Sequence, residues 1–155
     1  MVEKYPYDFW KRSHFEPGHI TTSAWVVNPE RTHTLLTHHK IFNMWLQLGG
    51  HVEPEDTTLH ESSLREVLEE SGLEGAIVMP DIFDIDMHLI DENARRQEPE
   101  HKHYDVRFLV EVPFVTPVMQ EAESHAVQWF PLSEVGELNK GNSIIRMANK
   151  TPGML

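Results

Sequence analysis

A short glutamate-rich segment constrains the fold of this chain more than any other part of the sequence. Residues 58–71 are predicted to form a helix, because Thr58 and Glu61 have the spacing of a capping box and Gly72 suits a left-handed C-cap. Side chains three and four positions apart then project from neighbouring points of one helix face. The carboxylates at these spacings, called the helix glutamates below, are Glu66, Glu69 and Glu70.

Three carboxylates on one helix face repel one another unless solvent or a cation offsets their charge. Hard oxygen ligands of this kind suit Mg²⁺ or Mn²⁺, whereas a solvated acidic face is the common alternative for a run of charges. The apolar positions are expected to turn toward another side of the helix; they are Leu64, Val67 and Leu68. A glycine pair, Gly49 and Gly50, and an arginine at fixed offsets from the glutamates favour the metal site.

The segment from Gly50 to Leu73 resembles the Nudix box, whose second half reads Arg-Glu-U-x-Glu-Glu-x-Gly-U with U a bulky aliphatic residue. That half matches at every position: Arg65, Glu66, Val67, Glu69, Glu70, Gly72 and Leu73. The first half departs from the pattern. Asp56 stands where the family has glutamate, and the loop between Asp56 and Arg65 is one residue longer than in the family.

This resemblance implies an α/β fold, the α/β/α sandwich with a mixed sheet that Nudix proteins share, with residues 1–155 as a single domain. It also implies hydrolysis of a diphosphate linkage in a nucleotide or a nucleoside diphosphate derivative by an activated water. The helix glutamates would bind Mg²⁺ or Mn²⁺ with the carbonyl of Gly49 as a further ligand, and one of them would act as the base. Arg65 would pair with a neighbouring carboxylate and hold the catalytic glutamates in place. A homodimer is compatible with this fold.

Composition limits the partners and the compartment. The formal net charge of -12 and the lack of a basic stripe argue against extended nucleic acid as a partner. The chain has no cysteine, which excludes disulfides and thiolate metal sites, and it has no apolar run long enough to cross a membrane. We therefore expect a cytoplasmic protein with a small anionic substrate whose charge is bridged by metal.

Several further side chains are candidates for the substrate site. Alternation along a predicted strand places His101, His103, Asp105 and Arg107 on one polar face, for which contact with water is the first expectation. The alternative is that this face lines the cleft, in which case the substrate-binding residues would be His51, Glu53, His103 and Arg107. A transition metal on His51, His101 and His103 is a further option. Other candidates are Lys40 and Lys102 for phosphate and Glu121 or Glu123 as an additional acidic residue.

The remaining elements are predicted mostly as strands. Expected strands cover 19–28, 32–37, 44–48, 76–79, 82–89, 103–112 and 126–130, with short helices at 132–138 and 143–148 and a polar loop at 91–100. Aromatic side chains are expected mainly in the core, Trp25 and Trp129 among them, although stacking on a base is an alternative for Trp45, Phe83 and Tyr104.

A catalytically silent Nudix domain that senses a nucleotide is the competing hypothesis for function. Retention of all three helix glutamates favours the enzyme, whereas Asp56 and the longer loop leave the sensor open.

Overall fold

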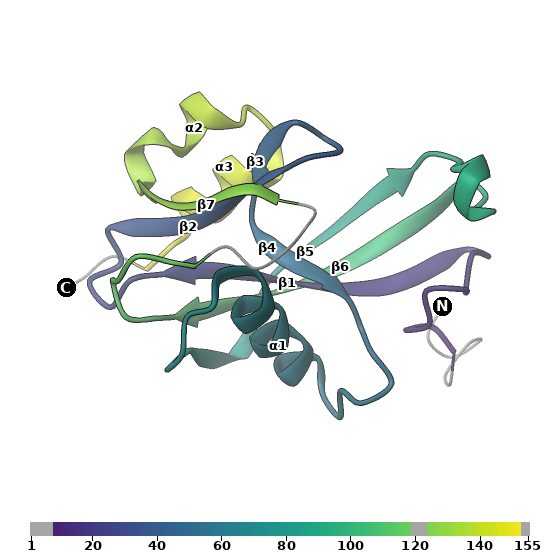
Figure 1. Cartoon of the computed structure of the whole chain (residues 1–155), viewed down its shortest axis with the longest axis horizontal. Helices are drawn as coiled ribbons and strands as arrows, with labels where there is room; N and C mark the ends of the chain where they lie inside the picture. The colour runs from purple at the N-terminus through teal and green to yellow at the C-terminus, as the bar shows by residue number, and fades with distance from the viewer. Residues whose placement is uncertain (1–7, 119–123, 153–155) are drawn as a thin grey trace.

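The fold is a seven-stranded mixed sheet covered by helices on both faces (Figure 1). It is seen in a computed structural model that describes residues 8–118 and 124–152. The strands are β1 (Gly18–Val27), β2 (His33–His39), β3 (Met44–Leu46), β4 (Leu48–His51), β5 (Ile77–Ile90), β6 (His101–Glu111) and β7 (Ser124–Pro131). The helices are α1 (Leu59–Ser71), α2 (Val135–Leu138) and α3 (Asn142–Asn149), with 3₁₀ turns η1 (Ala94–Arg96) and η2 (Leu132–Glu134).

Strand β1 organises the sheet. It runs parallel to β6 along its whole length, from Gly18 opposite Lys102 to Val27 opposite Glu111. On its other side β1 pairs antiparallel with β4 and then with β2, while β5 completes the far end of the sheet beside β6. β4 therefore joins the sheet beside the middle of β1, from Thr21 to Ala24, and this register decides which side chains meet at the site.

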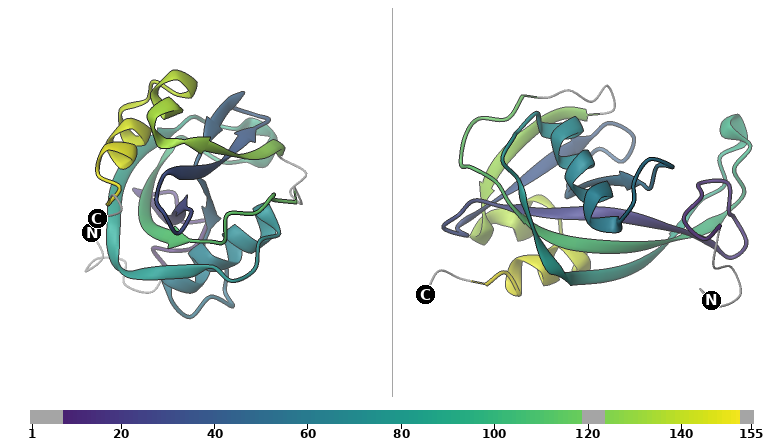
Figure 2. Two further views of the ribbon diagram at one scale, coloured as in Figure 1. Left: turned by 90° about the vertical axis from the view of Figure 1, so that its left-hand side faces the viewer. Right: turned by 90° about the horizontal axis from the view of Figure 1, so that it is seen from below.

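Alternation along the strands gives the sheet two apolar faces. Helix α1 lies on the opposite side of the sheet from α2 and α3 (Figure 2). One face packs on α1 through Val26, Phe108 and Val67, all essentially buried. The other face packs on α2 and α3 through Trp25, Val27, Leu36, Leu109, Val135, Ile144 and Met147. The predicted α/β/α sandwich is confirmed.

Helix α1 begins and ends where the local signals predict. The Thr58 hydroxyl accepts a hydrogen bond from the backbone N–H of Glu61, and Gly72 adopts the left-handed conformation with φ 68°. Of the apolar positions expected on another side of the helix from the glutamates, Val67 is fully buried and Leu64 packs against the core, whereas Leu68 is exposed. The helix instead turns two serines, Ser62 and Ser63, into its buried side.

Two strand assignments need correction. Residues 44–48 are not one strand: the strand is interrupted at Gln47, with β3 before it paired to β2 and β4 after it paired to β1. Conversely, the two strands expected at 76–79 and 82–89 form the single strand β5. Pro80 lies within β5, in the stretch between Val78 and Asp84 where the pairing register with β6 shifts. Among the described helices, none is long and apolar enough to span a membrane.

Candidate active site

The helix glutamates reach the sheet where α1 crosses β4 and β1. Ser62 and Thr22 bring the helix close to the sheet, with 2.9 Å between their hydroxyl oxygens. A Cβ on Gly50 would lie only 2.5 Å from Oε1 of Glu66, so the absent side chain of this glycine makes room for the carboxylate. The close approach explains in physical terms why a glycine stands at this position before the helix.

The three carboxylates differ in their surroundings. Glu66 and Glu70 are buried, and Oε1 of Glu70 accepts a hydrogen bond of 2.9 Å from the backbone N–H of Gly49. The side chain of Glu69 is 46% exposed. Burial raises the pKa of Glu66, and the nearby negative charge of Glu69 raises it further, although Arg65 opposes both effects. Binding of a cation or a proton would therefore stabilise the buried Glu66 carboxylate.

Arg65 connects these groups. Its Nε and one terminal nitrogen donate to the two carboxylate oxygens of Asp56, both at 3.0 Å, while the other terminal nitrogen contacts Glu66 at 3.0 Å and Glu69 at 3.1 Å. The guanidinium also donates to the carbonyl of His51. Partial burial disfavours the charged guanidinium, but the hydrogen bonds and negative charges of these carboxylates outweigh it and raise the pKa of Arg65. Asp56, the residue that departs from the family pattern, therefore positions Arg65.

A cavity of about 590 Å³ opens in front of the helix glutamates and is lined by all three of them and by Gly49, Gly50, His51, Glu53 and Arg65. The carboxylate oxygens in this lining suit a hard cation. In the part of the chain that the structure describes, the three carboxylates do not converge on one point, because Arg65 bridges Glu66 and Glu69. Mg²⁺ binds through one or two carboxylates and retains several waters, so the lining fits this ion without a tighter cluster.

A second cavity, of about 690 Å³, continues from the first. The two share Arg12, His39, Gly49, Gly50, His51 and Glu70. The second cavity is walled by His103 and Asp105 and by the connection between β5 and β6, the polar segment predicted as a loop. Two exposed apolar side chains, Ile41 and Phe42, complete its lining.

The polar face of β6 exists as predicted, but the expectation that it meets water was wrong. His101, Asp105 and Arg107 are all buried, at 4%, 2% and 2% exposure. Thr21 and Ser23 of β1 donate hydrogen bonds to the two oxygens of Asp105, at 2.9 and 2.7 Å. Side chains of the neighbouring strands cover this face, and the pattern of polar residues within β6 alone does not reveal that cover.

Arg107, a candidate for substrate binding, is buried and lies outside both cavity linings. Its guanidinium pairs with Asp105 at 2.8 Å and with Asp84 at 3.1 Å, and Asp84 in turn binds Arg146 and Lys150. Burial opposes ionisation of Asp84, but the hydrogen bonds and charges of Arg146 and Lys150 prevail and lower its pKa to about 2. Arg107 thus belongs to an ion network, buried at Arg107, Asp84 and Asp105, that holds β5, β6 and α3 together.

The aromatic candidates for base stacking lie in packing positions instead. Trp45 contacts Phe130 edge to face with 4.7 Å between ring centroids, Tyr104 packs on Phe9, and Phe83 belongs to the cluster beneath α3. Lys40 and Lys102 are exposed and lie outside both cavity linings, and Glu121 and Glu123 fall outside the described residues.

Two residues at the site were missed by the sequence analysis. Arg12 lines both cavities and pairs with Glu98 of the β5–β6 connection. His19 is fully buried and lies opposite His103 on the neighbouring parallel strand. Nothing in the neighbouring sequence marks either residue as part of the site, because both reach it through contacts with residues far away in the chain.

Comparison with known proteins agrees with this geometry. The sequence profile of the Nudix domain matches residues 17–148. No curated protein matches the chain. Similar solved structures include a NUDIX-family hydrolase from Clostridium perfringens, with 22% identity, a TM-score of 0.67, and coverage of 86% of this chain and 95% of the other.

Two further structures are similar in fold. The dihydroneopterin triphosphate pyrophosphohydrolase of E. coli has 16% identity and a TM-score of 0.67 over 84% of this chain and 92% of its own. The NUDIX domain of Shewanella oneidensis NrtR, solved in complex with ADP ribose, has 17% identity and a TM-score of 0.63 over 97% and 98%. From its box, its sandwich fold and its profile match, the chain belongs to the Nudix hydrolase family.

Proposed function

We propose that this protein hydrolyses a diphosphate linkage in a nucleotide or a nucleoside diphosphate derivative, with Mg²⁺ or Mn²⁺ and water as nucleophile. The observation that carries the proposal is the gathering of Glu66, Glu69, Glu70 and Arg65 around one cavity, at the point where Gly50 allows the helix to touch the sheet. A purely structural helix would have no reason to keep two buried carboxylates beside a cavity.

The chemistry requires charge neutralisation because diphosphates repel nucleophiles. A divalent ion bound there would neutralise phosphate charge and lower the pKa of the attacking water. In the proposed mechanism Glu66 and Glu70 hold the ion, with the carbonyl of Gly49 as a further oxygen ligand. Glu69, whose side chain is the more exposed, orients or deprotonates water. Arg65, which is itself held by a hydrogen bond to Asp56, fixes the positions of the Glu66 and Glu69 carboxylates.

The lining of the second cavity favours a small substrate. Its lining combines Ile41 and Phe42, which offer an apolar platform for a base, with Arg12, Arg95 and Arg96, which suit an anionic group. We propose that the diphosphate lies beside His51 and Glu53 in the first cavity while the nucleoside part extends into the second toward His103.

The alternative is a nucleotide sensor, a role for which the ADP ribose complex of the S. oneidensis domain offers a precedent for binding. The fold is shared by both possibilities and does not separate them. The buried carboxylates favour the enzyme, since a sensor has no need of Glu66 and Glu70 in buried positions beside the cavity.

The test is release of phosphate, pyrophosphate and nucleoside monophosphate from a panel of nucleotides, sugar nucleotides and dinucleoside polyphosphates, with Mg²⁺ or Mn²⁺. Wild type is compared with Glu69→Gln and Glu70→Gln, and with Glu74→Gln as a matched control, since Glu74 is exposed just beyond α1. We expect turnover of one substrate class that falls at least about 100-fold in one or both of the first two variants and is unchanged in the control. Tight binding without turnover in wild type, retained in both variants, would favour the sensor.

We also propose a homodimer formed through β5. This strand lies at the end of the described sheet and exposes a row of large apolar side chains: Ile82, Ile85, Met87 and Leu89. An apolar edge of this length favours pairing with a second chain. Sedimentation of wild type and Met87→Lys would test it, with a dimer expected only for wild type.

A further inference from the structure

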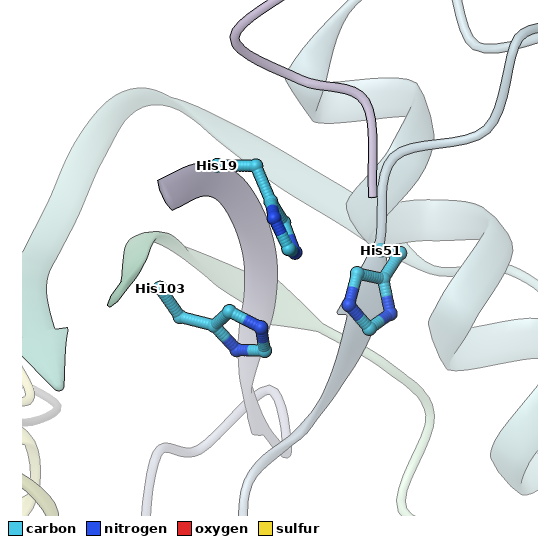
Figure 3. A group of neighbouring side chains, drawn as sticks. All are labelled: His19, His51 and His103. Atoms are coloured by element: carbon cyan, nitrogen blue, oxygen red, sulfur yellow. The ribbon is translucent and has the colours of Figure 1, made fainter. Parts of the chain in front are cut away.

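Outside the helix glutamates, the described residues contain one cluster with the geometry of a metal site. His19 comes from β1, His51 from β4 and His103 from β6, and one ring nitrogen of each lies within 4.8 Å of the others. Figure 3 shows the three imidazoles converging on a common space. Their ring centroids lie 4.7 to 5.2 Å apart.

The sheet register creates this convergence. His19 lies opposite His103 on the parallel neighbour β6, and His51 lies opposite Thr21 on the antiparallel neighbour β4. The three side chains therefore leave the same face of three adjacent strands, on a rigid scaffold that orders ligands better than a loop does.

His19 supplies an independent indication of a ligand. It is fully buried, and its Nδ1 lies 3.1 Å from the carbonyl of His14, to which only a protonated nitrogen can bond. Its Nε2 is then a lone pair, buried and without a hydrogen-bond partner among the described residues. A histidine whose Nδ1–H is held by a carbonyl while its Nε2 faces a cluster of imidazoles has the arrangement typical of a metal ligand.

A fourth histidine lies beside the cluster. His101 is fixed through Nδ1 by the carbonyl of Pro99 and places Nε2 at 3.3 Å from Nε2 of His103.

We propose that His19, His51 and His103 bind a borderline transition metal of the Zn²⁺ class, at a site distinct from the helix glutamates. Three neutral imidazoles suit Zn²⁺, Co²⁺ or Ni²⁺ and do not suit Mg²⁺. With metal–nitrogen distances of about 2.0–2.1 Å the ligand nitrogens of a tetrahedral site lie roughly 3.4 Å apart, so small side-chain rotations close the cluster.

Three protein ligands leave one tetrahedral position for water or a substrate group. His51 and His103 both line the second cavity, so that position would open into it. The cavity shares Gly49, Gly50 and Glu70 with the proposed hydrolytic site, which places the metal next to any substrate bound there.

The experiment is direct binding of Zn²⁺ to the chelator-treated full chain in the presence of excess Mg²⁺, by equilibrium dialysis with elemental analysis. The variants are His19→Gln and His103→Gln. His33→Gln is the matched control, since His33 lies on β2 and packs on Phe114, away from the cluster. Glu69→Gln separates this site from the helix glutamates. Circular dichroism and thermal melts establish that each variant is folded.

We expect one equivalent of Zn²⁺ per chain for wild type, His33→Gln and Glu69→Gln, and an affinity lower by at least about tenfold in the two cluster variants. Co²⁺ bound to wild type should give the intense visible absorption of a four-coordinate nitrogen site, a readout that needs no variant to fold. Absence of stoichiometric Zn²⁺ and Co²⁺ binding by wild type would overturn the proposal. So would retention of binding by the folded cluster variants, or its loss in Glu69→Gln alone.

Discussion

Replacing Gly50 by alanine should separate the catalytic role of the box from its structural role. The new Cβ would lie 2.5 Å from Oε1 and 2.9 Å from Cδ of Glu66, whereas ordinary contact begins at 3.4 Å. The Glu66 carboxylate would therefore have to move by about 0.9 Å. Because the displaced atoms are the end of a flexible side chain, the fold should accept the change with a loss of roughly 1 kcal/mol or less.

Activity should suffer far more than stability. A shift of about 1 Å in a group that aligns the reaction can cost about 100-fold in rate, and here the shift also disturbs the 3.0 Å contact between Glu66 and Arg65. We expect kcat/KM with Mg²⁺ to fall about 10- to 100-fold while the melting temperature changes by a few degrees.

Two other glycines provide the controls for this experiment. Gly136→Ala, in α2, places a Cβ 4.0 Å from Ile145 of α3 and should leave kcat/KM unchanged. Gly49→Ala would put a Cβ 2.5 Å from the backbone oxygen of Thr22, which cannot yield, so it should lower stability as well as activity. A Gly50→Ala enzyme with wild-type kcat/KM and metal dependence would refute the placement of Glu66 in the metal site.

Three further changes test other parts of the structure. Asp56→Asn removes one of the two carboxylate bonds to Arg65 and should lower kcat about tenfold with little change in melting temperature; an unchanged kcat would show that this anchor is dispensable. Arg107→Met leaves Asp105 and Asp84 buried without their shared cation and should destabilise the fold by about 3 kcal/mol in urea unfolding, and a loss below about 1 kcal/mol would contradict the ion network. In the folded state the pKa of Asp84 is lowered to about 2. Ionised Asp84 therefore adds about 1 to 2 kcal/mol, after screening, to the free energy of unfolding above pH 4, and this contribution is lost as pH falls toward 2. Urea unfolding of wild type and Asp84→Asn should therefore converge toward pH 2, and a stability gap that stays constant from pH 6 to 2 would disprove this titration.

Local signals in the sequence predicted α1 well. The capping box at Thr58, the left-handed Gly72 and the spacing of the glutamates are all encoded within a few residues, and the structure reproduces them. The general positions of β1, β2, β6 and β7 also followed from runs of β-branched and aromatic residues.

What the sequence could not reveal depends on pairing between distant strands. The polar side chains of β6 look solvent-exposed in the sequence, yet Thr21, Ser23 and Asp84 from neighbouring strands satisfy them in the interior. His19 offered no signal of its own, since its closeness to His103 arises only from the parallel register of β1 and β6. Long-range register sets the inner surface of the site, whereas local sequence sets the helix that carries the glutamates.

The most direct test of the central claim is hydrolysis in H₂¹⁸O, followed by ³¹P NMR and mass spectrometry of the products, with Mg²⁺ or Mn²⁺ present or removed by chelator. The account predicts that one phosphate product gains one ¹⁸O per cleaved diphosphate linkage, that chelation abolishes turnover, and that Glu69→Gln together with Glu70→Gln does the same with metal present. Cleavage that continues unchanged in chelator, or that survives loss of both carboxylates, would contradict it.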